Sequence, residues 1–207
     1  MRLVWTTDLH LDSVSTLAWE QWVQKISSLK ADGLVITGDI SEGDDVVRQL
    51  QRFVSVNQLP VYFVLGNHDF YGSTFQATRQ NVIHACRDSE QLHYLTDLSP
   101  LHVSAGTYLL GEDGWADGTV GNYEESTIHL KDLERIGDFK AAGEFAWKQQ
   151  LQEIGRASAK RLRSKLEQLP SNAYQIIVLT HAPPFREACW YEGKTTDDNW
   201  APFFVAG

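Results

Sequence analysis

The chain is poor in cysteine, in basic residues and in long apolar runs, and each shortage excludes a class of protein. Only two cysteines, Cys86 and Cys189, occur among 207 residues. They are too few for a disulfide framework, and we expect free thiols in a reducing compartment. No apolar run approaches the roughly 18 residues that a membrane helix requires. Lys and Arg number 18 against 27 Asp and Glu, a formal net charge of −9, which disfavours nucleic-acid binding by phosphate neutralisation.

The composition that remains is that of a soluble globular protein. Hydrophobic residues make up 43% and charged residues 22% of the chain, close to the average for such proteins. Asp8 stands where a signal peptide would carry its apolar stretch, so we expect a cytoplasmic protein that is not exported. The length suits one domain over residues 1–207, and the surplus of carboxylates suits metal cations as ligands.

Short apolar strands alternate with amphipathic helices in the first half of the chain. Strands are predicted at residues 3–7, 33–37 and 61–65, and helices at 17–29, 46–57 and 75–86. This order predicts a parallel sheet with helices on its faces, and continuous apolar strands are typical of a sheet covered on both sides.

The second half of the chain is less regular. Closely spaced strands at 92–95, 101–104 and 107–111 predict antiparallel hairpins. Residues 115–143 show no sustained period and are interpreted as a lid or insertion. A helix at 145–169 precedes a final strand at 176–180. A basic cluster on this helix is interpreted as a solvated polar face in preference to an anion site; it comprises Arg156, Lys160, Arg161, Arg163 and Lys165.

Polar side chains follow four of the predicted strands, at the point where each strand ends. They are Asp8 and His10, then Asp39, then Asn67, His68 and Asp69, and finally His181.

Each of these motifs has a local explanation when it is taken alone. Gly38-Asp39 and Gly66-Asn67 are common turn sequences. A turn gives no reason for an adjacent His68-Asp69 pair, however, and ligand sites of open α/β sheets form at the carboxyl ends of strands. Carboxylates and imidazoles without thiolates suit Mn, Fe, Co, Ni or Zn. Two such ions that share a carboxylate are suited to phosphate ester hydrolysis.

The ordered motifs resemble the signature of the calcineurin-like metallophosphoesterases. That signature reads Asp-x-His, Gly-Asp, Gly-Asn-His-Asp/Glu and a later His, and the matching segments here are 8–10, 38–39, 66–69 and 181. The resemblance covers nearly the whole chain. It implies an α/β protein with a four-layer α/β/β/α sandwich, a layering that periodicity alone does not provide.

The same resemblance implies a ligand set for two divalent metal ions. Asp8 and His10 would hold the first metal, Asp39 would bridge both ions, and Asn67 and His181 would hold the second. The reaction implied is hydrolysis of a phosphate mono- or diester by attack of a metal-bridging hydroxide.

The resemblance also implies catalytic roles for the residues around Asn67. His68 would lie outside the metal shell, where it would bind phosphate together with Asn67 or protonate the leaving oxygen. Asp69 would orient the imidazole of His68 and raise its basicity.

One family motif is missing. Members close their site with Gly-His-x-His, whereas the seven histidines here form no such motif. Either the sequence is a truncated form of a longer protein or it is a variant with an incomplete site; the apolar ending Phe203-Phe204-Val205 favours truncation. Loss of the last strands would leave a sheet edge uncovered, which predicts self-association.

Two further functions are kept as alternatives. The missing motif favours a catalytically weakened binding scaffold, which the His68-Asp69 pair opposes. A nuclease subunit is disfavoured by the net charge of −9. Aromatic residues in segments near the site could stack on a nucleobase or an aryl leaving group, although packing of the lid is the preferred interpretation; they are Trp115, Trp147, Trp190, Tyr191 and Trp200.

Overall fold

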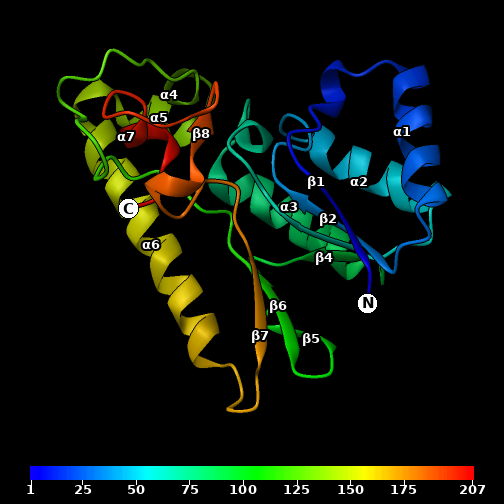
Figure 1. Cartoon of the computed structure of the whole chain (residues 1–207). Coiled ribbons are helices and arrows are strands. Elements are labelled where there is room, and N and C mark those ends of the chain that lie inside the picture. Colours follow the sequence, from blue (N-terminus) through cyan, green and yellow to red (C-terminus); the bar gives the residue numbers. More distant parts are fainter.

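Two β-sheets pack face to face in the computed structural model, which describes residues 1–207 (Figure 1). The first sheet has the order β1-β2-β3-β4 and is parallel throughout. Its strands are β1 (Leu3–Thr6), β2 (Gly33–Thr37), β3 (Val61–Val64) and β4 (Leu92–Tyr94). The second sheet, of order β5-β6-β7, consists of β5 (Leu101–Ser104), β6 (Thr107–Gly111) and β7 (Gln175–Leu179).

Three helices cover the outer face of the first sheet. They are α1 (Thr16–Ser28), α2 (Asp45–Val56) and α3 (Phe75–Arg87), close to the predicted ranges. Ser15 and Thr74 begin α1 and α3, because each hydroxyl accepts a hydrogen bond from a backbone amide three residues on. Their apolar faces and the strand residues Leu34, Val61 and Phe63 form the larger core cluster.

A smaller core fills the space between the two sheets. It contains Val35 and Val64 from the first sheet and Leu109 and Leu179 from the second. With helix α6 (Trp147–Glu167) beside the second sheet, the order of layers is the four-layer α/β/β/α arrangement of the metallophosphoesterase type (Figure 1).

The predicted hairpins are correct for one pair of strands and wrong for another. β5 and β6 are antiparallel neighbours, as expected. β4 instead pairs in parallel with β3, because α3 carries the chain back across the sheet between them. Short spacing along the sequence shows that strands are present but does not identify their partners.

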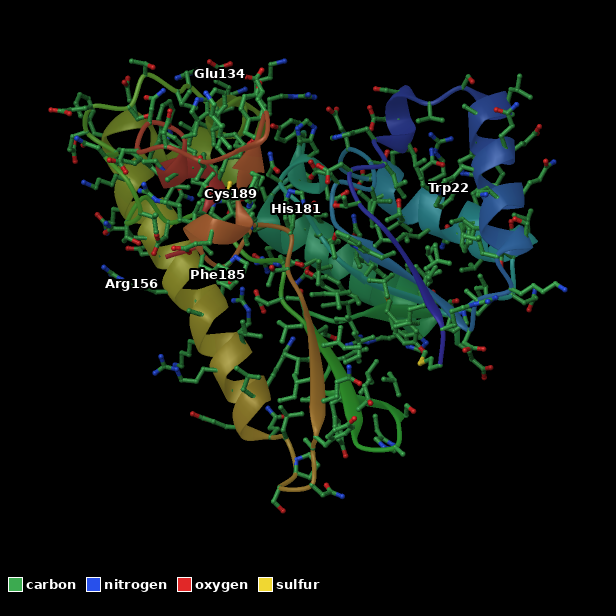
Figure 2. All side chains as sticks on the ribbon, viewed as in Figure 1. Trp22, Glu134, Arg156, His181, Phe185 and Cys189 are labelled. Carbon is green, nitrogen blue, oxygen red and sulfur yellow. The ribbon has the colours of Figure 1, made fainter.

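Helix α6 corrects the interpretation of the basic cluster. Arg156, Lys160 and Arg163 are exposed, and Arg156 projects into solvent (Figure 2). Lys165, however, is only 7% exposed, and its ammonium donates to the carbonyls of Leu95, Thr96 and Gly111. Arg161 pairs with the buried Glu112 carboxylate. These two residues bind the helix to the strand ends, so the solvated-face interpretation was wrong for them.

Short elements cover one end of the molecule (Figure 1). Within residues 115–143 only α4 (Asp132–Arg135) and α5 (Gly137–Ala142) are regular, and the lid interpretation stays a prediction. The remaining elements are α7 (Ala201–Phe204), the β8–β9 hairpin (Trp190–Tyr191 and Lys194–Thr195) and single turns of 3-10 helix at Leu11–Ser13, His68–Phe70, Glu144–Ala146 and Arg186–Ala188.

Apolar surface is uncovered along the free edges of the sheets. β1 and β7 each pair with one strand only. Trp5 on β1 is 70% exposed, and Tyr174, Ile176 and Val178 in and before β7 are also exposed.

Both cysteines are free thiols, as expected. None of the helices combines the length and apolar character that crossing a bilayer requires.

Candidate metal centre

The loops after β1 and β2 are joined so that their polar residues converge. Backbone amides of Asp8 and His10 donate to the carbonyls of Gly38 (3.2 Å) and Asp39 (3.0 Å). Asp8, His10 and Asp39 all have left-handed backbone conformations, with φ of 51°, 42° and 51°. Such strained conformations persist where the surrounding structure holds them, and they cluster at functional sites.

Two glycines allow His181, which ends the second sheet, to approach these loops. A Cβ atom on Gly38 would collide with the His181 ring, and a Cβ on Gly66 would collide with both that ring and Asp39 Oδ1. Gly38 also has φ of 92°, which disfavours any other residue. The glycines of the Gly38-Asp39 and Gly66-Asn67 motifs therefore serve close packing around the Asp39 carboxylate as well as turn formation.

Asp39 lies at the centre of the site and is 4% exposed. Two groups of potential ligand atoms include it, each with all atoms within 4.8 Å of one another: Asp8, Asp39 and His181, and His10, Asp39 and His68. Asp39 Oδ1 is 3.6 Å from His181 Nε2, and Oδ2 is 3.8 Å from His10 Nε2. The two oxygens of one carboxylate thus face two different groups of ligands.

His181 and Asn67 direct two hydrogen-bond acceptor atoms at each other, and a cation between these atoms would stabilise the arrangement. His181 Nδ1 donates to the Thr37 carbonyl (2.8 Å), which leaves Nε2 as an acceptor in the neutral ring. Asn67 donates its amide to Asp132 Oδ1 (2.8 Å), which turns its own Oδ1 towards His181 Nε2 at 3.1 Å. Two acceptors at this distance are reconciled by a proton or by a metal ion.

The electrostatics around His181 favour positive charge. Burial disfavours the charged ring, but the Asp39 carboxylate, the Thr37 carbonyl and the Asp8 carboxylate outweigh it and raise the pKa of His181. The Asp39 and Asp8 carboxylates, which lie in one group of potential ligand atoms with His181, would also attract a divalent cation. The donor set of carboxylate, imidazole and carboxamide therefore fits borderline divalent metals in chemistry as well as in position.

Asp69 has other partners than the resemblance implied. Its side chain is fully buried, and it accepts from the backbone amides of Ile40 (2.8 Å), Ser41 (3.0 Å) and Gly66 (2.7 Å). No hydrogen bond joins it to the His68 ring. Complete burial and the nearby Asp39 carboxylate raise the pKa of Asp69 to about 8. The geometry therefore makes Asp69 a clamp between the loops after β2 and β3.

The His68 ring is held by contacts between rings. Its centroid lies 4.6 Å from that of His10, edge to face, and 4.3 Å from that of Tyr71, in a stacked arrangement. Neither ring nitrogen makes a hydrogen bond, so both are available to a ligand. Because its ligand atom also falls within the group of His10 and Asp39, the position suits either a phosphate-contacting residue or a metal ligand.

Sequence reasoning missed three buried carboxylates: Asp113 and Asp132, which contact the loop of Asn67, and Glu112, which precedes Asp113 and pairs with Arg161. Glu112 and Asp113 directly follow β6, the same strand-end pattern that identified the other residues. Asp113 accepts from Leu65 N and from the Arg79 guanidinium, so it holds the loop that precedes Asn67. Asp132 lies in the aperiodic segment, where nothing in the sequence distinguished it from other acidic residues.

Comparison with known proteins identifies the family and the fold. Curated protein sequences give no match. Among solved structures, the crystal structure of phosphopantetheinyl hydrolase (PptH) from Mycobacterium tuberculosis is similar, with a TM-score of 0.68 and 15% identity over 99% of this chain and 75% of that one. At this identity the likeness shows the fold alone. The family model of the calcineurin-like phosphoesterases, hydrolases that normally depend on divalent metals, matches residues 1–205. The chain therefore belongs to the calcineurin-like phosphoesterase family.

Proposed function

We propose that the protein is a metal-dependent phosphoesterase that hydrolyses phosphate mono- or diesters. The observation that carries this proposal is that the buried Asp39 carboxylate belongs to both groups of potential ligand atoms. Asp39 would hold both ions, His10 one of them, and Asn67 and His181 the other. The resemblance places Asp8 with His10, whereas its ligand atom lies in the group of Asp39 and His181, so Asp8 would hold either ion. Ions bound there would supply an acidified water as nucleophile and neutralise charge on the phosphoryl oxygens.

The protein's own residues would position the substrate and move one proton. The His68 ring has both nitrogens free and stacks on Tyr71, which fixes its plane. In its charged form it would bind a phosphoryl oxygen and then give its proton to the departing alcohol oxygen. Asn67, whose amide Asp132 fixes, would contribute to phosphate binding. Asp69 would act as a positioning residue, since it aligns the loops that carry Asp39 and Asn67.

Two substitutions test this proposal, with Mn²⁺ as the added metal and 4-nitrophenyl phosphate and bis(4-nitrophenyl) phosphate as substrates. His68→Ala is expected to lower kcat/KM by about 10²–10⁴-fold and to leave the metal content unchanged. Asp39→Asn is expected to abolish both metal binding and hydrolysis. His84→Ala, an exposed histidine on α3, is the control.

The results separate the alternatives. Activity that survives both changes would remove the proposal. Loss of one equivalent of metal in His68→Ala would make His68 a ligand in place of a proton donor. Full metal binding without hydrolysis of any ester would favour the binding scaffold.

Two finer predictions belong with this proposal. The free thiols Cys86 and Cys189 suit a reducing compartment, for which the cytoplasm is our prediction. The free edge of β7, with exposed Ile176 and Val178, still predicts self-association, which concentration-dependent sedimentation would detect.

A further inference from the structure

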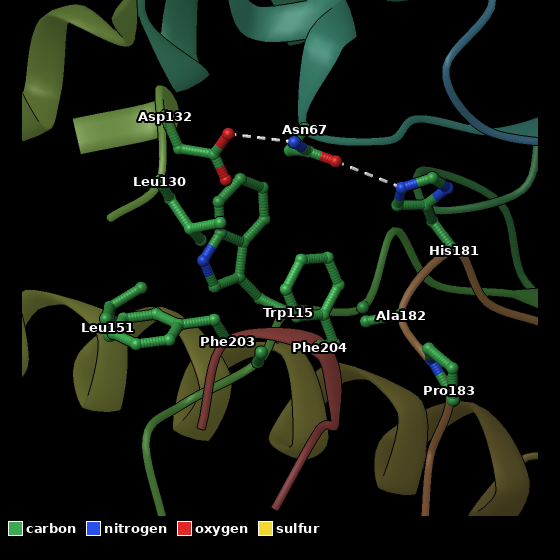
Figure 3. A pocket seen from close by; sticks show the side chains of 12 residues that line it. Asn67, Trp115, Leu130, Asp132, Leu151, His181, Ala182, Pro183, Phe203 and Phe204 are labelled. Atoms are coloured by element: carbon green, nitrogen blue, oxygen red, sulfur yellow. Dashed lines mark hydrogen bonds between the residues drawn. The ribbon is translucent and has the colours of Figure 1, made fainter. Parts of the chain in front are cut away.

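A small apolar cavity opens beside the candidate metal centre (Figure 3). Its volume is about 90 Å³, and Asn67 and His181 form part of its wall. The indole of Trp115, four residues after the end of β6, forms part of the rest. The remaining side chains come from the segment before α4, from α6 and from α7. The apolar members include Leu130, Leu151, Phe203 and Phe204.

The cavity wall is rigid on the side of Trp115. This indole is buried and packs edge to face against Phe70 and Phe75, and at a tilt against Phe139. Its N–H makes no hydrogen bond. A preformed apolar wall of this kind favours burial of an apolar group over collapse of the space.

Asp132 places one charged oxygen in this apolar wall. The residue is only 5% exposed. Its Oδ1 accepts from Asn67 Nδ2 (2.8 Å) and from the Tyr71 hydroxyl (2.6 Å). Its Oδ2 makes no hydrogen bond, and Figure 3 shows this second oxygen turned towards the Trp115 indole, on the cavity side. Because Oδ2 has no partner within the protein and faces the cavity, it can accept a hydrogen bond from a donor group of a bound molecule.

We propose that this cavity binds the alcohol portion of the phosphoester, and that it selects a compact apolar group carrying one hydrogen-bond donor for Asp132 Oδ2. The proposal rests on the proposed function, because the substrate phosphate would sit against Asn67 and His181 at the cavity wall. A short alkyl chain that ends in a hydroxyl group satisfies both the apolar lining and the unpaired oxygen.

The apolar lining disfavours two other substrate groups. A nucleobase would place the polar atoms of its ring edges against apolar side chains without partners, which costs affinity. A polyol would leave several hydroxyl groups without partners against Leu130, Leu151 and the phenylalanines, which costs affinity for each. The nucleobase-stacking role considered for Trp115 is therefore not the one proposed here.

Matched esters test the preference in the Mn²⁺-loaded enzyme. Pentyl phosphate and 4-hydroxybutyl phosphate have chains of equal length and differ only in the terminal methyl or hydroxyl group. We expect kcat/KM to be about tenfold higher for the hydroxyl ester, since one hydrogen bond to a charged group contributes about that factor. The phosphate of butane-1,2,3,4-tetrol is expected to be the poorest substrate.

Asp132→Asn tests the role of Oδ2 separately from that of Oδ1. Asn67 Nδ2 and the Tyr71 hydroxyl would keep the new amide oxygen in the Oδ1 position, and an NH₂ group would then face the cavity. The ratio of kcat/KM for the hydroxyl ester to kcat/KM for pentyl phosphate is expected to fall to about one. Leu130→Gln is expected to weaken both esters equally, and Asp88→Asn, at the exposed end of α3, is the control that keeps the tenfold preference.

A binding measurement without metal separates this proposal from the proposed function. Butane-1,4-diol is expected to bind the metal-free protein, detected by NMR saturation transfer, and to bind Asp132→Asn more weakly. Binding without hydrolysis of any ester would support the cavity and refute the phosphoesterase. Hydrolysis of both esters at equal rates, or absence of diol binding, would overturn the cavity proposal.

Discussion

The Asp69 carboxylate holds two loops by three backbone hydrogen bonds, and its loss has a specific expected result. In Asp69→Asn the amide oxygen still accepts from Ile40 and Ser41, but its NH₂ group faces the Gly66 amide, so one buried N–H loses its acceptor. We expect the free energy of unfolding to fall by about 1–3 kcal/mol. Mn²⁺ affinity is expected to weaken about 10–100-fold, as for other outer-shell partners.

Urea unfolding and Mn²⁺ titration measure these two effects. Asp88→Asn is the control, because Asp88 is exposed. If Asp69→Asn left Mn²⁺ affinity unchanged and altered only the pH dependence of hydrolysis, Asp69 would act on His68 as first implied, and not on the loops.

The buried Glu112 carboxyl group should make the free energy of unfolding depend on pH. Burial raises the pKa of Glu112, and the Asp113 carboxylate adds to this, while hydrogen bonds from Arg161 oppose it. The unfolded state therefore ionises first as the pH rises above about 4.5, and the folded state is disfavoured in that window. The stability of the wild type relative to Glu112→Gln should fall as the pH rises, by about 1.4 kcal/mol for each unit of pKa difference.

Urea unfolding of both proteins between pH 4 and pH 8 checks this. Glutamine does not titrate, so the difference between the two proteins isolates the carboxyl group. A wild type that gained stability over Glu112→Gln with rising pH would show that Arg161 dominates and lowers this pKa.

The residues of the candidate site were predictable where a strand placed them. Asp8, Asp39, Asn67 and His181 each follow an apolar run, and parallel strands bring such positions to one edge. The partners of Asp69 were not predictable, because hydrogen bonds to backbone amides of another loop leave no pattern in the sequence. Asp132 has no regular period around it and becomes recognisable only through its contact with Asn67.

Helix α6 is attached to both sheets by Lys165, an arrangement with a measurable contribution to stability. The ammonium donates to three carbonyls, those of Leu95, Thr96 and Gly111. Lys165→Met would keep most of the alkyl chain but leave these acceptors without a donor. We expect the free energy of unfolding to fall by about 3 kcal/mol, measured by urea unfolding.

Lys160→Met is the matched control, because Lys160 lies on the exposed side of the same helix. An equal small effect from both substitutions would show that the three carbonyls find other donors, such as water. We expect a large loss of unfolding free energy for Lys165→Met and almost none for Lys160→Met. That difference would show that the buried ammonium stabilises the fold and that the exposed one on the same helix does not.

At this scale the sequence predicted where helices begin and end better than how they pack. The residues of α6 that are buried are Leu151, Ser158 and Lys165, spaced by seven. A search for apolar periodicity overlooks this stripe, because two of its three members are polar. Polar residues are buried there only because Glu112 and the strand-end carbonyls provide partners, and those partners are distant in the sequence.

At the scale of the whole molecule, the two sheets contribute unequally to the candidate site. The loops of the first sheet provide Asp8, His10, Asp39 and Asn67, whereas the second sheet provides His181 alone. Figure 2 shows His181 between the two halves of the molecule. The pairing of the sheets followed from the family resemblance, because alternation along the sequence establishes a parallel sheet but not a second sheet facing it.

A metal ion bound by His181 and Asp39 would therefore join the two sheets, and its removal should destabilise the whole molecule. Any ligand that binds only the folded state stabilises it, by about 2.7 kcal/mol at a concentration one hundred times its dissociation constant. For a chain of 207 residues this corresponds to a rise in Tm of about 5–10 °C. We expect Mn²⁺ to produce this rise in thermal unfolding and EDTA to reverse it.

His181→Ala is expected to remove most of the Mn²⁺-dependent rise, because His181 is the one candidate ligand that the second sheet provides, whereas His84→Ala should keep all of it. A rise of the same size in His181→Ala would mean that the metal is held by the first sheet alone. Independence of Tm from Mn²⁺ in the wild type would contradict metal binding at this centre altogether, because a folded-state ligand cannot bind without raising the free energy of unfolding.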